Sequence, residues 1–380
     1  MEKLDPKVEK KQRQRLFAIG TGRIDLPFFL LAMLLLVVGL VTLYSASYAT
    51  AFDETGNSAY YVTRQAVFAV MGVVIIFLIS RFNYQKLKLA AFPLLVAAVV
   101  LLVLVLVIGT TKNNATRWLR LGPILFQPSE IAKLAVIVCF ATLISRFKEK
   151  MQTFRYGIIP FVLILAVIAG LLVLEPHISA TVIIFAVGAV LMLIGGVKLG
   201  WFVGAFAVLG TAGYFVASKM EHVQQRLAVW KDPWIDELGS GFQSIQSLYA
   251  IGSGGLLGLG LGNSRQKFYY LPEEFNDYIF AIICEELGFI GAMMILLLFA
   301  LFIIRGFWLA MHTRDRFGSL LISGIMTMFA LQVFLNIAVV TTLIPATGIS
   351  LPFFSYGGTA LIIQMAEVGV VLAVSRQNVV

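Results

Sequence analysis

The segment YYLPEEFNDYIFAIICEELGFIG, residues 269–291, passes from an acidic, polar loop into an apolar helix. Asp277 stands where the polar residues give way to apolar ones, and Glu285 and Glu286 follow about two turns deeper at the usual helical rise. Carboxylates inside an apolar helix are costly, so each of the three needs a partner or a function. The composition of the whole chain indicates what surrounds them.

The chain has the composition of an integral membrane protein. Of its 380 residues, 59% are hydrophobic and 13% are charged, and its mean hydropathy is +0.92. A soluble protein needs a far more polar surface. Apolar runs long enough to cross a bilayer predict an all-α, polytopic protein with ten transmembrane helices. The runs lie at about 26–45, 62–80, 89–109, 129–145, 157–174, 178–195, 201–217, 278–304, 318–340 and 356–375.

Lys and Arg residues gather in alternate loops, which predicts the orientation, because short cytoplasmic loops retain positive charge. The tail at 1–23 is basic, and further cations follow the second, fourth, sixth and eighth predicted helices. Both termini are therefore predicted to be cytoplasmic, and residues 24–380 form one membrane domain with a long outer loop at 218–277. This bias and attraction to anionic lipid account for the net charge of +9, so we expect no nucleic-acid partner.

The sequence has no pattern typical of a bound nucleotide or a metal cluster. It lacks a P-loop, a Gly-rich dinucleotide fingerprint and an Asp-x-Asp pair. Cys139 and Cys284 both fall within predicted helices and are expected to be free thiols. The three histidines are too scattered to predict a shared metal. We expect no certain cofactor, and whether a divalent cation assists is left open.

The stretch NATRWLRLGPILFQPSEIAK, residues 114–133, leads from the outer side into the fourth predicted helix. Glu130 falls in the first helical turn, where a carboxylate suits the positive helix end. Lys133 lies about one turn below it on the same face. The two could form an internal ion pair or bind a substrate, and the sequence leaves both open. Just outside the membrane the stretch carries two arginines around an aromatic residue, namely Arg117, Trp118 and Arg120.

Three other segments bring polar groups to the same outer boundary. Arg64, near the outer end of the second predicted helix, either contacts a substrate or extends to water. The loop at 218–277 carries cations, among them Lys267, and its apolar composition predicts short amphipathic pieces along the membrane surface. The segment 336–360 interrupts its backbone with two prolines and a Gly-Gly pair, which predicts a cavity wall or a tight turn.

Asp277 itself has two interpretations. It could cap the helix that follows, where a carboxylate favours the exposed N–H groups, or it could face a cavity. On a helix of 3.6 residues per turn, Glu285 lies about 80 degrees around from Asp277 and Glu286 nearly opposite. At most one of these glutamates can share the surroundings of Asp277. The other is expected to pair with a basic residue or to be protonated.

Several motifs together resemble the SEDS family, the shape, elongation, division and sporulation proteins of RodA and FtsW type. They are ATRWLRLG, QPSEIAKLA, GSGFQSIQSLYAIGSGGLLGLGLGNSRQKFYYLPE, DYIFAIICEELGFIG and IPATGISLPFFSYGG. The resemblance covers nearly the whole chain and is closest in wording to the FtsW and sporulation branch. It implies a peptidoglycan glycosyltransferase that polymerises lipid II at the outer face of the bacterial cytoplasmic membrane, in division, elongation or sporulation.

The resemblance also implies partners and site residues. The expected partners are lipid II, the growing lipid-linked glycan, a class B penicillin-binding transpeptidase, and other membrane proteins of the divisome or elongasome. The family's essential aspartate falls on Asp277. Where the family usually has a carboxylate, this chain has His177 within EPHIS, so the family's role for that corner is not carried over. The substrate-binding residues are predicted as Arg64, Arg117, Trp118, Arg120, Glu130, Lys133, Lys267 and Ser355, and the structural ones as Glu285, Glu286, Pro345, Gly357 and Gly358.

Elementary chemistry agrees with this assignment. In polymerisation from a lipid-linked donor the leaving group is a diphosphate, so cations can stabilise it without a general acid. The acceptor sugar hydroxyl needs a positioned base, and Asp277 is our candidate. A transporter that moves lipid II or another anionic lipid across the bilayer is the main alternative, because buried charges could also form a relay for a headgroup. A scaffold without catalysis is a third interpretation.

Overall fold

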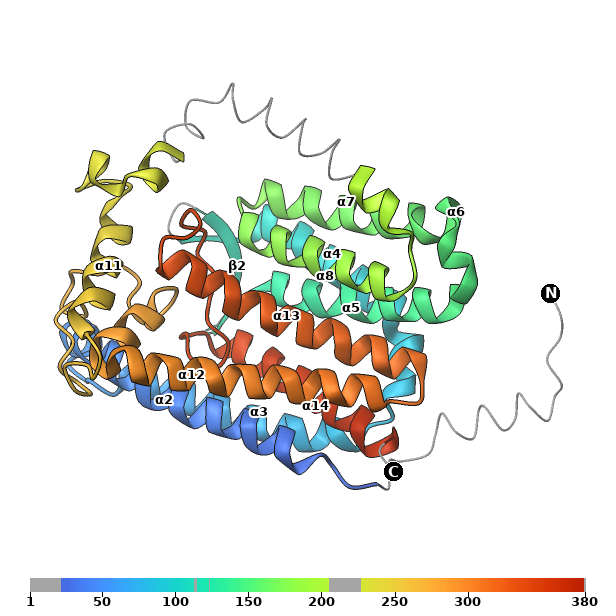
Figure 1. The fold of residues 1–380 in the computed structure, drawn as a ribbon, viewed down its shortest axis with the longest axis horizontal. Helices are drawn as coiled ribbons and strands as arrows, with labels where there is room; N and C mark the ends of the chain where they lie inside the picture. Colours follow the sequence, from blue (N-terminus) through green and yellow to red (C-terminus); the bar gives the residue numbers. More distant parts are fainter. Residues whose placement is uncertain (1–21, 113–114, 123, 205–226, 379–380) are drawn as a thin grey trace, which may run out of the picture.

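The computed structural model describes residues 22–112, 115–122, 124–204 and 227–378, which form a helical bundle with a small sheet at one end (Figure 1). Nine of the ten predicted transmembrane helices are present in this part of the chain. Residues 1–21 of the basic tail, most of the seventh predicted helix at 201–217, and residues 218–226 of the outer loop lie outside the described residues.

The apolar runs form helices because a helix satisfies its backbone hydrogen bonds within one segment, as hydrocarbon requires. Seven helices in the described part of the chain are long and apolar enough to cross a membrane. The long helices are α2 (Leu26–Thr55), α3 (Tyr60–Arg81), α4 (Leu87–Ile108), α5 (Pro128–Phe147), α7 (Ile159–Leu174), α8 (Ile178–Ile194), α12 (Ile279–His312), α13 (Arg316–Val340) and α14 (Gly358–Asn378). The short ones are η1 (Tyr84–Lys86), η2 (Lys148–Gln152), α6 (Phe154–Gly157), η3 (Pro233–Asp236) and α11 (Phe242–Gly254).

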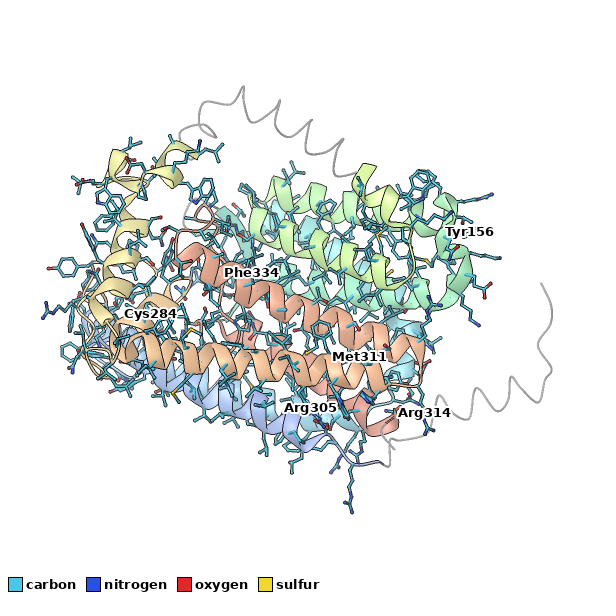
Figure 2. The ribbon with its side chains drawn as sticks, viewed as in Figure 1. Tyr156, Cys284, Arg305, Met311, Arg314 and Phe334 are labelled. Atoms are coloured by element: carbon cyan, nitrogen blue, oxygen red, sulfur yellow. The ribbon has the colours of Figure 1, made fainter. Side chains whose placement is uncertain are left out.

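The two ends of the bundle carry different kinds of segment. Tyr156 of α6 and Arg314 of the turn between α12 and α13 lie at one end (Figure 2), whereas α11 and β2 lie at the opposite end (Figure 1). The first end holds loops whose cations predict a cytoplasmic position. The charge distribution therefore predicts that the end with α11 is the outer one.

A small antiparallel sheet at the outer end is an addition to the predicted helices. Its strands are β1 (Thr110–Lys112), β2 (Ala115–Leu121) and β3 (Ile124–Phe126), in the order β1-β2-β3. Successive residues of β2 face opposite sides of the sheet, and accordingly Leu119 is buried and Arg120 is exposed. Polar and apolar residues do not alternate strictly in TRWLRL, so the sequence pattern does not predict this strand.

Helices α3 and α14 pack along each other through glycines. A Cβ atom added at Gly72 of α3 would come within 2.7 Å of Met365, and one added at Gly369 of α14 would come within 3.0 Å of Ile79. Both approaches are shorter than ordinary van der Waals contact, so a larger side chain at either position must displace its neighbour. The two helices therefore meet more closely than helices with larger residues at these positions could.

The non-helical segment between α13 and α14, residues 341–357, folds back into the bundle. Phe353 is buried there, with its ring stacked at 5.5 Å on Phe329 of α13. The ring of Phe302 from α12 meets Phe353 edge-on at 5.8 Å and stacks on Phe28 of α2 at 4.8 Å. Burial of these rings fixes the broken segment against three helices.

Helix α12 is interrupted at Gly288, which has φ 65° and ψ −170°. The interruption lets the outer loop exchange backbone hydrogen bonds with the helix. The N–H groups of Leu259 and Gly260 donate to the carbonyls of Glu285 and Glu286 at 3.0 and 2.9 Å, and the N–H of Phe289 donates to a loop carbonyl, that of Gly255, at 2.9 Å. These bonds replace those that an unbroken helix would make.

Replacing Gly288 with Ala is expected to destabilise the fold by about 2 kcal/mol or more, because the φ is left-handed. The new Cβ would also come within 2.3 Å of the backbone nitrogen of Gly258. Gly170→Ala is the matched control, since Gly170 lies in α7 with open space around its Cβ position. Thermal unfolding in detergent should show a lower midpoint for Gly288→Ala alone. Equal midpoints for the two variants would contradict the strain argument.

Candidate active site

A cavity of about 480 Å³ lies among the outer ends of the helices. Its walls come from α3, α5, α8, α13 and α14, from strands β2 and β3, and from the turn before α12 and the broken segment 341–357. Of the nine residues predicted to be catalytic or substrate-binding, seven line it, namely Arg64, Arg117, Trp118, Glu130, Lys133, Asp277 and Ser355. Segments far apart in the sequence thus meet around one space.

Asp277 lies on the wall of this cavity, in the turn before α12. The helix begins at Ile279, and Tyr278, not Asp277, is in the cap position. A Cβ atom at Gly348 would come within 3.0 Å of the Asp277 Oδ2 atom. The carboxylate therefore packs against backbone of the broken segment where only glycine leaves room for it.

The broken segment is joined to the turn that carries Asp277 by hydrogen bonds. The Ser355 hydroxyl donates to the carbonyl of Asn276 at 2.6 Å and accepts from the N–H of Leu351 at 2.7 Å. The N–H of Tyr356 donates to the carbonyl of Phe275 at 3.0 Å. Ser355 lines the cavity, but its hydroxyl is occupied by backbone groups, so its predicted contact with substrate has yet to be tested.

The three residues predicted to shape this segment lie where its path turns. Pro345 and Gly357 belong to the non-helical stretch, and Gly358 begins α14. A Cβ atom at Gly358 would come within 2.2 Å of the ring of Phe68. The break between α13 and α14 thus forms a wall of the cavity, which is the first of the two interpretations that its sequence allows.

Two arginines reach the cavity, Arg64 from α3 and Arg117 from β2. The guanidinium of Arg64 lies over the ring of Tyr60, 4.7 Å from its centroid. Arg117 of β2 donates a hydrogen bond to the carbonyl of Pro176. Burial lowers the pKa of Arg117, and the negative charges of Asp277 and Glu175 oppose that shift. Arg117 is therefore electrostatically coupled to the candidate base.

Glu130 and Lys133 form a buried ion pair on α5. The Lys133 Nζ lies 2.7 Å from the Glu130 Oε1, and the two residues are 4% and 7% exposed. Both also line the cavity. The internal pair that the sequence allowed is therefore present, and it does not prevent either group from meeting a ligand there. An ammonium in this position offers further donors beyond the one that Glu130 accepts.

The corner at Glu175 and His177 holds two titratable groups whose pKa values are shifted by burial. Both side chains are buried, and neither oxygen of Glu175 has a hydrogen-bond partner. Burial raises the pKa of Glu175 to about 7, against the opposing charge of Arg117. Burial, with the charges of Arg117 and Lys133, lowers the pKa of His177 to about 3. His177 lines the cavity, so the substituted corner is part of the candidate site.

Two predicted substrate contacts lie elsewhere. Lys267 is fully buried, its Nζ pairs with the Glu286 Oε1 at 2.7 Å, and it does not line the cavity, so its predicted contact with the diphosphate is wrong. The positive charge of Lys267 is neutralised by Glu286, the deeper of the two glutamates. A carboxylate buried away from water needs such a partner. Arg120 is exposed on β2 and does not line the cavity. A cation count alone could not distinguish these residues from Arg64 and Arg117.

The glutamates Glu285 and Glu286 join the outer loop to α12. Glu285 accepts hydrogen bonds from the hydroxyl of Ser264 and from the N–H of Arg265. Besides Lys267, the Glu286 carboxylate accepts from the Ser45 hydroxyl at 2.5 Å. Neither glutamate lines the cavity. Their contacts suit the structural roles assigned to them.

The sequence interpretation missed four polar residues deeper in the bundle. Gln332 of α13 and Gln364 of α14 line the cavity, and Asn336 lies beside it. Glu367 of α14 is 1% exposed. Polar residues within apolar helices are a known signal of function, and that signal could have identified all four. In the described part of the chain, no group of three His, Cys, Asp or Glu side chains is placed to hold a metal ion.

Comparison with known proteins gives consistent matches over nearly the full length. The protein family described as "Cell cycle protein", covering FtsW, RodA and SpoVE, matches residues 25–379. Stage V sporulation protein E of Bacillus subtilis is 41% identical over 358 residues, which is 93% of this chain and 97% of that protein. A probable peptidoglycan glycosyltransferase FtsW of Geobacter metallireducens is 34% identical over 93% of this chain and 95% of its own length.

Solved structures agree with the sequence matches. A chain from a study of the structural coordination of polymerization and crosslinking by a peptidoglycan synthase complex has a TM-score of 0.78 and 31% identity. It is matched over 98% of its length and 93% of this chain. The rod shape determining protein RodA of Thermus thermophilus has a TM-score of 0.69 and 28% identity, over 94% of this chain and 98% of its own.

Glu175 should make the fold less stable as pH rises. Its pKa is about 7 in the folded protein against an ordinary 4.5, so between these values the unfolded chain releases a proton that the folded chain retains. Stability is therefore lost as pH rises through this window. The thermal midpoint of Glu175→Gln should exceed that of the wild type at pH 7, and the difference should shrink toward pH 4.5. A pH-independent difference, or the same behaviour in the exposed control Glu149→Gln, would overturn this prediction.

Substituting Lys267 with Met should destabilise the protein by about 3 kcal/mol, because it leaves the Glu286 charge buried without its partner. Lys231→Met, at an exposed lysine of the same outer loop, is the matched control and should change little. The double variant with Glu286→Leu should recover much of the loss. Chemical unfolding in detergent gives all three values, and an unaffected single variant would show that the pair is not structural.

Proposed function

The chain belongs to the FtsW, RodA and SpoVE family of cell cycle proteins, and from this premise we propose that the cavity around Asp277 is where it polymerises lipid II. It is a peptidoglycan glycosyltransferase and a multi-pass protein of the bacterial cytoplasmic membrane. The proposal concerns where on this chain the reaction takes place and which groups carry it.

One observation carries the assignment: the Asp277 carboxylate and three cations share one cavity at the outer end of the bundle. Asp277, Arg64, Arg117 and Lys133 all line it. The headgroups of lipid-linked substrates lie at the membrane surface while their tails remain in the bilayer. A cavity at this depth can therefore receive both the reducing end of a donor and the sugar of an acceptor.

In this mechanism Asp277 is the general base. As the acceptor GlcNAc 4-hydroxyl attacks the anomeric carbon of the donor, the Asp277 carboxylate accepts its proton. The new bond forms between the hydroxyl oxygen and that carbon, and the bond from the carbon to the diphosphate breaks. Asn336 supports the base, because its side-chain amide donates to the Asp277 carbonyl at 2.7 Å and so fixes the backbone from which the carboxylate projects.

The cations would hold the diphosphate as its negative charge increases. Arg64 and Arg117 reach the cavity from α3 and β2, and Lys133 lies deeper on α5. Preorganised cations stabilise developing charge most effectively where water is limited. Trp118, beside Arg117, offers an aromatic surface to the same ligand. A divalent cation is not required by this scheme.

The product strand must be crosslinked by a separate activity, for which we propose a class B penicillin-binding transpeptidase as partner. Support comes from the similar chain found in a peptidoglycan synthase complex that coordinates polymerization and crosslinking. Other membrane proteins of division, elongation or sporulation would then join the pair. Similarity to stage V sporulation protein E and to FtsW proteins favours those two processes over elongation.

A lipid II transporter is the second candidate, and the buried pair of Glu130 and Lys133 is the observation that favours it. Such a pair could accompany a polar headgroup through the bundle. The two functions differ in detergent, where there are no leaflets to cross. Glycan formation from lipid II by the purified protein would support the enzyme, and its absence even with the transpeptidase added would support the transporter.

Asp277→Asn is expected to reduce the rate of glycan formation at least about 100-fold, because the amide cannot accept the proton. The variant keeps the shape of the side chain, so the thermal midpoint should change little. Asp53→Asn is the matched control, since Asp53 is an outer carboxylate outside the cavity, and it should polymerise normally. Gel analysis of labelled lipid II products measures both. A normal rate for Asp277→Asn would remove the proposed base.

A further inference from the structure

Gln332 is a polar side chain on the cavity wall that the proposed mechanism does not use. It lies on α13, roughly 12 Å from the outer end of that helix at Val340, and is 2% exposed. Its Oε1 atom is enclosed without a partner, and within the described part of the chain its amide forms no hydrogen bond. A buried amide that no neighbour satisfies needs a role outside the fold, and a ligand of the cavity supplies one.

The other two glutamines on the cavity wall already have partners in the protein. The Oε1 of Gln364 accepts from the N–H of Phe353 at 3.0 Å, which connects α14 to the broken segment. The Nε2 of Gln127 lies 3.4 Å from the Nε2 of His177. Among the glutamines that line the cavity in the described residues, Gln332 is therefore the one whose amide is left for a ligand.

The position of Gln332 on α13 places it below the candidate base. Asn336 follows it by four residues, so the two side chains lie on the same face of the helix. The Asn336 amide donates to the carbonyl of Asp277 at 2.7 Å. Gln332 is thus one helical turn deeper than the residue that supports the backbone of Asp277, and it lines the same cavity.

Lys133 borders this cavity from α5, which packs directly on α13. A Cβ atom added at Gly324 of α13 would come within 2.6 Å of the Ile137 side chain of α5, so the two helices touch at this level. Lys133 lies about one turn outward of Ile137. Gln332 lies about two turns outward of Gly324. An ammonium and an amide therefore border one space from two adjoining helices.

The chemistry of these two groups favours an anionic ligand. Because the Oε1 atom of Gln332 is enclosed, its Nε2 group is the polar atom that can meet a ligand, and Nε2 is a donor. The Nζ of Lys133 is also a donor. A ligand that satisfies both must supply acceptors, and phosphate oxygens supply several together with negative charge.

We propose that the Nε2 group of Gln332 donates a hydrogen bond to a diphosphate oxygen of the lipid-linked donor, alongside the ammonium of Lys133. This inference rests on the proposed function, because it takes that donor as the ligand of the cavity. The amide adds a directed bond without adding charge, so it orients the diphosphate that the cations attract. As the bond to the anomeric carbon breaks, the charge on the diphosphate increases and the bond from Nε2 becomes stronger.

The test measures binding of undecaprenyl diphosphate, which carries the diphosphate without a sugar, to the full-length protein in detergent. Gln332→Met keeps the length of the side chain and removes its donor, so the Kd should rise about tenfold. The thermal midpoint should not fall, because Met also removes the enclosed oxygen that lacks a partner. With lipid II as substrate, kcat/KM should fall about tenfold or more, because the bond is strongest in the transition state.

Thr327→Val is the matched control. Thr327 is buried on the same helix and its hydroxyl also lacks a hydrogen-bond partner, but it does not line the cavity. Its Kd for undecaprenyl diphosphate should stay within about twofold of the wild-type value. An unchanged Kd in Gln332→Met, or an equal loss of affinity in Thr327→Val, would overturn the inference.

Two further outcomes would also overturn it. Weaker binding of lipid II by Gln332→Met, with normal binding of undecaprenyl diphosphate, would show that Gln332 contacts a sugar instead. Gln332→Leu is the second variant, for use if the Met variant does not fold. A lower thermal midpoint in both variants would assign Gln332 to the stability of the fold.

Failure of this inference differs from failure of the proposed function. If the cavity is the donor site, Lys133→Met weakens binding of undecaprenyl diphosphate, and Asp277→Asn still binds it while polymerising poorly. If those results hold and Gln332→Met binds normally, only the role of Gln332 is wrong. If the wild-type protein does not bind undecaprenyl diphosphate, or Lys133→Met binds it normally, the cavity is not the donor site and the proposed function fails.

Discussion

One side-chain amide, that of Asn336, holds the candidate site together. Its Nδ2 atom donates to the carbonyl of Asp277 at 2.7 Å and to that of Ile349 at 2.6 Å. These two carbonyls belong to the turn before α12 and to the broken segment, neither of which has the regular backbone bonding of a helix. Irregular backbone is tolerated within a membrane protein only when its polar groups find partners inside the protein. Asn336 supplies both partners from the rigid helix α13.

The charged residues of the outer half form two sets that differ in burial: some form a buried ion pair, and others border the cavity. Glu286 and Lys267 lie away from water and neutralise each other's charge. Their ion pair connects the outer loop to α12. Asp277 and Arg117 border a cavity, where they interact without becoming fully enclosed. A buried pair is retained as a structural element, whereas groups at a cavity remain available to a ligand. Residues of one chemical type therefore have different roles within a few turns of α12.

Much of this arrangement is predictable from the sequence, and the failures have physical causes. Long apolar runs predict helices because few backbone conformations satisfy their own hydrogen bonds in hydrocarbon. The nine runs in the described part of the chain all form helices. The convergence of Asp277, Arg64 and Lys133 followed from motifs and from their common depth. The predicted role of Lys267 was wrong because no local sequence pattern indicates that a lysine will form an ion pair with a glutamate 19 residues away. The break at Gly288 and the loop that forms hydrogen bonds with it depend on tertiary contacts, so they could not be predicted from the sequence either.

Helices α3 and α14 border the cavity on one side, and their glycine contacts have a consequence for how substrates arrive. Gly72 lies against Met365 and Gly369 against Ile79, so the two helices are in direct contact at these two levels. Under the proposed function, the hydrocarbon tails of donor and acceptor would leave the cavity elsewhere than at these contacts. Two residues without a side chain thus bear on the path of a nascent strand.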